Sequence, residues 1–159
     1  MNFTIDQLVN LARMTQEDLN RINQCRRKHN KLGFGYQLSY VKIMNCFPVQ
    51  LPFEVVDDIL NYTSVQLGIP PNVISSYSQK RETLAEHQEQ IREYCGLQRF
   101  GESVVPIINE FLFQEACHLE QTGALMVKVE QFLKTQKILT PSMVKFRVSP
   151  RFVRPCMLL

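Results

Sequence analysis

The most distinctive chemistry in the sequence is a cluster of basic side chains between residues 21 and 31. The cluster consists of Arg21, Arg26, Arg27, Lys28, His29 and Lys31, and one more lysine, Lys42, follows it. Arg and Lys neutralise phosphates and release the counterions of DNA. The neighbouring amides of Asn30 and Gln37 can hydrogen-bond to base edges or phosphates. This pattern predicts contact with a nucleic acid, and the alternative is a solvated cationic surface.

The charge distribution along the chain supports a surface that faces an anion. The net charge is +3, but residues 1–50 carry +4, residues 51–133 carry −7 and residues 134–159 carry +6. Such asymmetry is typical of a protein with one surface for an anion and another for water. Ordinary solvated surface is again the alternative.

Motifs for catalysis or metal binding are missing from the sequence. It contains no GxSxG, P-loop, HExxH or GxGxxG pattern. A helical carboxylate site would need Glu-x-x-His side chains that project into a bundle core. The richest acidic stretch instead predicts a solvated helix face and a packed His87, and a di-metal enzyme is the least favoured alternative. This stretch contains Glu82, Glu86, His87, Glu89 and Glu93.

The cysteine count and the hydrophobicity pattern indicate in which cellular compartment the protein is expected. Five cysteines, an odd number, are widely spaced without a CxxC pair, which argues against a disulfide framework and a zinc ribbon. No apolar run reaches the roughly 18 residues of a membrane helix. The first residues lack the features of a secretion signal. We therefore expect a cytoplasmic protein without a membrane partner.

The elements that must position the basic cluster are predicted to be helices almost throughout. Capping residues, apolar stripes and breakers predict an all-α, multi-helix bundle of about seven or eight helices with helix-turn-helix-like units. Gly33 is expected to separate two helices, and Pro52 to lie in the first turn of another. The expected helices cover about 4–12, 15–29, 34–46, 52–67, 72–77, 80–95 and 103–119, with a last one after residue 123.

Three regions are expected along the chain. Residues 1–69 form an N-terminal helical unit with the basic cluster, residues 70–147 form a second helical unit, and residues 148–159 form an irregular basic tail. The boundary is placed at the Pro70-Pro71 pair, which cannot continue a helix.

Two blocks of the sequence resemble a known family. Residues 26–41, RRKHNKLGFGYQLSYV, resemble the signature RRxxNRLGFAxQLxYLR at the start of replicative (class II) transposases of the Tn3 family. A second block keeps the order and spacing of that family's pattern QLGV…Y…R…EHxxxIRxxxGFRxF. A weaker agreement lies at residues 137–141. The second block comprises Gln66-Leu67-Gly68-Ile69, Tyr77, Arg81, Glu86-His87, Ile91-Arg92, Gly96 and Arg99-Phe100.

The resemblance implies a function for the whole segment. In that family this is the N-terminal, helical, DNA-binding region, which recognises the terminal inverted repeats of the transposon. A larger C-terminal part carries a DDE catalytic core that uses Mg²⁺. We therefore expect a chain with no catalytic core and no cofactor of its own, which binds double-stranded DNA and has another transposase subunit as a second candidate partner. The alternative is an orphan helical interaction module without specific DNA binding.

The expected DNA contacts follow from the basic cluster and from the family resemblance together. Leu32, Gly33, Phe34 and Leu38 are expected to serve the fold. Arg81 and Arg99 are expected as contacts only because of the family resemblance. Their alternative role is structural, as bridges between helices and the acidic helix face. The chain departs from the signature at Lys31, which loses the fork of an arginine, and at Gly35, which costs about 1 kcal/mol of helix propensity. The full set of expected contacts is Arg21, Arg26, Arg27, Lys28, Asn30, Lys31, Gln37, Lys42, Arg81 and Arg99.

Overall fold

The computed structural model describes residues 2–116 and 122–141, and within these ranges the chain is all-α. The described part contains eight α-helices, one 3-10 helix and two isolated β-bridges. This confirms the predicted fold class. None of the described helices is long and apolar enough to cross a membrane. The expected tail at 148–159 lies outside the described residues.

The chain divides into two compact units, at Cys95/Gly96. The sequence placed the boundary at residues 69/70, but α5 (Ile74–Ser78) and α6 (Arg81–Cys95) both pack on α3 (Lys28–Met44) and therefore belong to the first unit. The proline pair lies at the start of a short 3-10 helix, Pro71–Val73, within that unit.

The first two helices begin as their sequences predict. In α1 (Ile5–Ala12) the Thr4 hydroxyl accepts from the Gln7 backbone, and the Gln7 side chain accepts from the Thr4 backbone. In α2 (Gln16–Asn23) Thr15 and Asp18 form the same reciprocal pair. Each capping box satisfies two backbone N–H groups that the helix leaves free.

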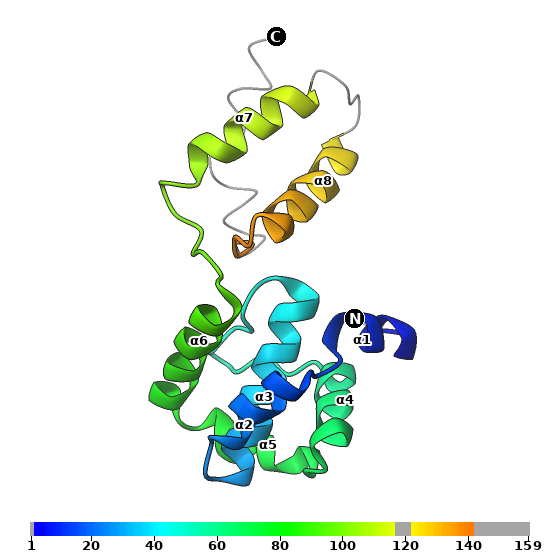
Figure 1. Cartoon of the computed structure of the whole chain (residues 1–159), viewed down its shortest axis with the longest axis vertical. Coiled ribbons are helices and arrows are strands. Elements are labelled where there is room, and N and C mark those ends of the chain that lie inside the picture. Colours follow the sequence, from blue (N-terminus) through cyan, green and yellow to red (C-terminus); the bar gives the residue numbers. More distant parts are fainter. Residues whose placement is uncertain (1, 117–121, 142–159) are drawn as a thin grey trace. The chain divides into compact units, whose positions relative to one another are not determined.

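Helix α3 is the centre of the first unit. It packs against α1, α2, α5, α6 and α4 (Asp57–Leu67), and Figure 1 shows it between α6 and α4. Ten consecutive residues, Leu32 to Val41, are buried. Neighbouring helices therefore cover this helix on all sides, which explains its weak amphipathicity.

The prediction that Gly33 separates two helices is wrong. The break lies earlier, at residues 24–27, and Gly33 is a buried residue inside α3. A Cβ atom at Gly33 would lie 2.3 Å from carbon atoms of the Tyr77 ring. Gly33 thus serves close packing of α5 on α3 and not a turn.

The segment before α4 also differs from its prediction. Pro52 follows a cis peptide bond in the turn between Gln50 and Phe53, and α4 begins only at Asp57. The Tyr36 hydroxyl fixes this segment to α3, because it donates to the Glu54 carbonyl oxygen (2.8 Å) and accepts from the Val56 N–H (2.9 Å). The predicted stops at Gly68 and Gly96 are confirmed, with φ of +64° and +63°.

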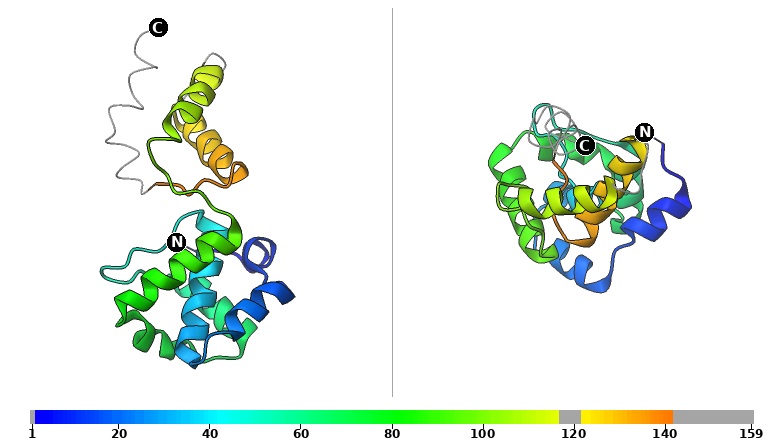
Figure 2. Two further views of the ribbon diagram at one scale, coloured as in Figure 1. Left: turned by 60° about the vertical axis from the view of Figure 1, so that its left-hand side comes forward. Right: turned by 90° about the horizontal axis from the view of Figure 1, so that it is seen from above.

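The second unit is built on α7 (Val105–Ala116) and α8 (Thr122–Thr135), which lie side by side in Figures 1 and 2. The rings of Phe111 and Phe132 stack with their centroids 4.2 Å apart. A β-bridge joins Gln98 to Ile138 and closes the unit. Its buried side chains are Val104, Ile108, Leu112, Val129, Leu133 and Ile138.

The packing of Gly33 leads to a stability prediction. We expect Gly33→Ala to lower the free energy of unfolding by about 1–3 kcal/mol, because the new methyl group must displace the Tyr77 ring. Gly35→Ala is the matched control: its Cβ would meet flexible side-chain ends such as Leu67 Cδ1 at 2.9 Å, and alanine recovers helix propensity. Urea unfolding of both variants measures the difference. Equal losses in the two would contradict the role of Gly33.

Candidate DNA-binding surface

The basic cluster lies around the N-terminal end of α3. Arg26, Arg27 and Lys28 are exposed, and within the described residues they make no side-chain hydrogen bond or ion pair. Lys31 lies one turn further on and reaches Asn23, with its Nζ 3.3 Å from Oδ1. Repulsion among these cations costs stability, and none of them forms an ion pair within the described residues.

The start of α3 is open to an anion. Arg27 occupies the N-cap position without a side-chain hydrogen bond, in contrast to the capped α1 and α2. The first helical hydrogen bond is from Lys31 N–H to the Arg27 carbonyl oxygen, so the three preceding N–H groups have no acceptor in the helix. The helix dipole adds positive potential at this end. Backbone and side chains together therefore favour a bound phosphate.

Two side chains in the first turn of α3 have unsatisfied polar atoms. The Nε2 atom of His29 and the Oδ1 atom of Asn30 are buried without a hydrogen-bond partner. His29 belongs to the basic cluster, but the expected contacts omitted it. Its adjacency to Lys28 was the only sequence signal for it.

The burial of α3 limits which of its residues can touch DNA. A recognition helix of a helix-turn-helix protein lies in the major groove with one face exposed. Here α2 and α3 are joined by a short turn at residues 24–27, but Leu32–Val41 are buried. Only the ends of α3 are open to a duplex, and this geometry favours contact of its cationic N-terminal tip with the phosphate backbone over reading of a groove along the helix.

Gln37 is fully buried and is removed from the proposed contacts. Its Nε2 donates to the Tyr77 hydroxyl (2.6 Å) and to the Leu84 carbonyl oxygen (3.4 Å), while its Oε1 accepts from Gln88 (2.9 Å). The amide thus holds α5 and α6 on α3. The sequence places it six residues beyond Lys31 of the cationic stretch and does not show that the helix is enclosed there.

Lys42 lies at the other end of α3 and forms an ion pair with Asp18. At 1.5 Å per residue, it lies about 21 Å along the helix from Lys28. Burial raises the pKa of Asp18, but hydrogen bonds from Lys42, the Thr15 backbone and Tyr94 outweigh it and hold the pKa below its ordinary value. Lys42 therefore has a structural partner and stands apart from the tip.

The remaining expected contacts are Arg21, Arg81 and Arg99. Arg21 is exposed on α2 with its guanidinium carbon 5.2 Å from the centre of the Tyr94 ring. Arg81 is exposed as the first residue of α6, with no side-chain partner in the described part of the chain. Arg99 is exposed and belongs to the second unit.

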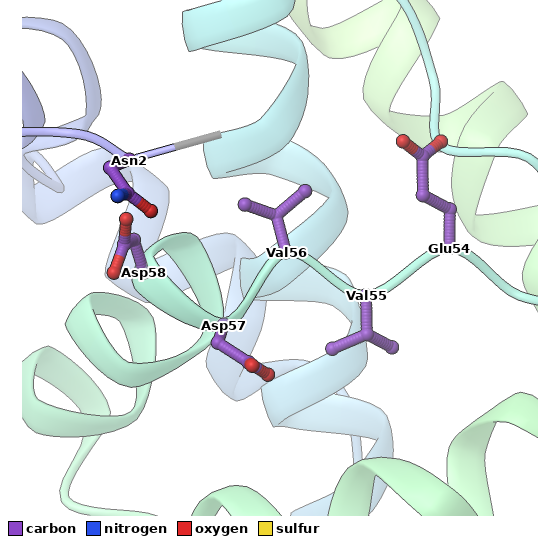
Figure 3. Close-up of a pocket in the computed structure, with 6 residues that line it drawn as sticks. All are labelled: Asn2, Glu54, Val55, Val56, Asp57 and Asp58. Atoms are coloured by element: carbon purple, nitrogen blue, oxygen red, sulfur yellow. The ribbon is translucent and has the colours of Figure 1, made fainter.

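A separate pocket in the first unit has the opposite charge. Its volume is about 530 Å³, and its lining consists of Asn2, Glu54, Val55, Val56, Asp57 and Asp58. Figure 3 shows the carboxylates pointing in different directions. Asp58 accepts from the Phe3 N–H (2.9 Å) and Glu54 from the Val49 N–H (3.1 Å). No group of side chains suited to a metal ion occurs among residues 2–116 and 122–141.

Together, the fold and this surface define a small helical module with an exposed cationic helix terminus. The chain belongs to the family described as "Domain of unknown function (DUF4158)", which it matches over residues 2–147.

Curated relatives with transposase names match the chain over much of its length. It is 37% identical over 97 residues to the transposase for transposon gamma-delta of Escherichia coli (strain K12), which covers 60% of this chain and 10% of the relative. It is 28% identical over 128 residues to the transposase for transposon Tn1546 of Enterococcus faecium, a match that covers 80% of this chain and 13% of the relative. The transposase for transposon Tn3926 of Escherichia coli is 27% identical over 140 residues, which cover 87% of this chain and 14% of the relative.

These matches support the resemblance to the N-terminal region of Tn3-family transposases. The chain spans between about a tenth and a seventh of the length of these relatives.

His87 forms part of a polar network beneath the surface. It is 6% exposed, and its Nδ1 lies 2.9 Å from the Tyr77 hydroxyl. Burial lowers the pKa of His87 below its ordinary value of 6.5. This placement agrees with the packed histidine expected from the sequence.

The depressed pKa of His87 leads to a pH prediction. Below about pH 6.5 the unfolded chain binds a proton at this position and the folded chain does not, so the free energy of unfolding decreases as the pH falls from 6.5 towards the folded pKa. We expect His87→Gln to flatten this part of the profile. Urea unfolding between pH 8 and pH 5 tests this, with pH 8 as the baseline for each protein. Parallel profiles for wild type and variant would contradict it.

Proposed function

We propose that the chain binds double-stranded DNA at transposon ends, with recognition of the terminal inverted repeats. The observation that carries the proposal is the uncapped N-terminal tip of α3, surrounded by the exposed cations of Arg26, Arg27 and Lys28. Such a tip is suited to a phosphate of the backbone. The transposase names of the relatives supply the DNA context.

The proposed role of each residue in this surface follows from the exposure of its side chain. Arg26, Arg27 and Lys28 are proposed as phosphate contacts, and Lys31 supports them. Arg21, Asn30 and Arg81 are proposed to approach the duplex beside the tip, and Arg99 from the second unit. Phosphate contacts fix register without reading sequence, so recognition of a specific end requires contacts beyond the tip.

The competing function is an interaction module that binds protein. It is favoured by isolated apolar side chains on the surface, such as Ile5 on α1 (75% exposed) and Val65 on α4 (81% exposed). Single exposed apolar residues are common on monomeric proteins, so we rank this function second.

The test compares a transposon-end duplex with a random duplex. If four to six charges touch phosphate, log K against log salt has a slope of roughly −4 to −5, from about −0.9 per contact. We expect Arg26→Ala/Arg27→Ala to flatten the slope by roughly 1 to 2 units and to weaken all duplexes alike. Fluorescence anisotropy across a salt series measures both quantities.

The matched control removes the same charge elsewhere. Arg13→Ala/Lys128→Ala changes two exposed cations outside the cluster, and we expect it to leave the slope unchanged. If the control variant loses binding and the Arg26/Arg27 variant does not, the surface is misassigned. Equal binding to every duplex would instead remove the recognition of transposon ends from the proposal.

We further propose that the chain contributes binding and no strand chemistry. A two-metal DNA-cleaving site needs converging carboxylates, and those of the described residues are dispersed. We expect neither cleavage nor joining of a labelled transposon-end duplex with Mg²⁺ present. A strand-cleavage activity that disappears when an acidic residue of this chain is changed would refute this.

A further inference from the structure

A second pocket in the first unit opens beside the basic cluster. Its volume is about 280 Å³, and Cys25 in its lining directly precedes Arg26 in the chain. We call it the His87 pocket. Its lining consists of Arg21, Gln24, Cys25, Phe34, His87 and Gln90.

The hydrogen-bond network favours one tautomer of His87. The Leu84 carbonyl oxygen can only accept a hydrogen bond, which identifies the Gln37 atom beside it as the amide nitrogen. This nitrogen also donates to the Tyr77 hydroxyl. The Tyr77 hydroxyl then donates its own hydrogen to His87 Nδ1, 2.9 Å away. We assign the hydrogen of neutral His87 to Nε2, because Nδ1 is then the acceptor for the Tyr77 hydroxyl hydrogen.

This N–H group faces the pocket with only a weak partner. The Nε2 atom of His87 lies 4.0 Å from the Cys25 sulfur atom. Thiol sulfur is a weak acceptor, and burial raises the pKa of the Cys25 thiol. A side chain that is 6% exposed and lines the pocket thus has only a long contact to sulfur at Nε2. An oxygen or ring-nitrogen acceptor of a ligand would satisfy it.

The other walls of the pocket suit a flat ligand. The Phe34 ring is buried and meets the His87 ring edge to face at 5.2 Å. The Arg21 guanidinium lies over the Tyr94 ring, which limits its freedom. The amides of Gln24 and Gln90 stand at the exposed rim. Aromatic walls with amide and guanidinium groups are typical of sites for an unpaired base.

We propose that the His87 pocket receives a single nucleobase turned out of the DNA that the basic cluster holds, an inference that rests on the proposed function. The pocket volume accommodates one base. Its donors, His87 Nε2–H and the Arg21 guanidinium, suit a base with adjacent acceptors, such as the O6 and N7 atoms of guanine. Adenine, which presents an amino group beside N7, fits these donors less well.

The experiment uses transposon-end duplexes in which one guanine at a time is mispaired. A mispaired base costs less to turn out than a paired one. We expect one position at which the mispair tightens binding about tenfold, equivalent to about 1.4 kcal/mol. Replacement of that guanine by a mispaired adenine should lose most of the gain. Anisotropy titrations at fixed salt provide the affinities.

Three variants separate the pocket from the phosphate contacts. Gln90→Trp fills the rim of the pocket and should abolish the gain while it leaves the salt slope unchanged. Ala85→Trp, at an exposed position of α6 outside the lining, should keep the gain. Arg26→Ala/Arg27→Ala should keep the ratio of mispaired to paired affinity and flatten the salt slope. Circular dichroism verifies that each variant is folded.

The outcomes distinguish the two proposals. If duplexes bind but no mispair tightens binding, or if Gln90→Trp keeps the gain, the pocket assignment fails and the proposed function stands. If no duplex binds, the proposed function fails. A titration with millimolar dGMP, followed through the His87 ring signals in NMR with inorganic phosphate as comparator, then decides the pocket. Shifts caused by dGMP alone support it, and equal shifts or none overturn it.

Discussion

The enclosure of α3 by five other helices is the constraint on which the first unit depends. Gly33 lets the Tyr77 ring approach the helix backbone, and the Gln37 amide then bonds to the Tyr77 hydroxyl at 2.6 Å. Tyr77 in turn positions His87 on α6. Close packing and a satisfied polar network act at the same place, so loss of one partner leaves buried polar groups unpaired.

The same enclosure limits where the proposed DNA contact can lie. Since the middle of α3 is buried, its cations lie at its two ends, and those at the N-terminal end form the basic cluster, while Lys42 at the other end is paired with Asp18. The N-terminal end combines free backbone N–H groups, the helix dipole and exposed arginines, which all favour phosphate. The His87 pocket lies next to it because α2, α3 and α6 meet there. Fold and proposed function thus share a single structural cause.

The two sequence blocks that carry the family resemblance meet in space within this core. Gly33 and Phe34 of the first block contact Tyr77 and His87 of the second. Much of what reads as a DNA-binding signature is therefore packing of α5 and α6 on α3. Gln37 shows the consequence, because a polar residue inside the signature proves to be part of the core.

The sequence by itself determined the helical class, the helix starts at Thr4 and Thr15 and the stops at Gly68 and Gly96, because these depend on local backbone chemistry. It also located the cluster of cations. Only the tertiary structure decided that α3 runs through Gly33, that the first unit extends to Cys95 and that Gln37 is buried. Each of these depends on which distant part of the chain packs against the residue. The spacing of hydrophobic residues or the presence of a glycine does not specify such tertiary contacts.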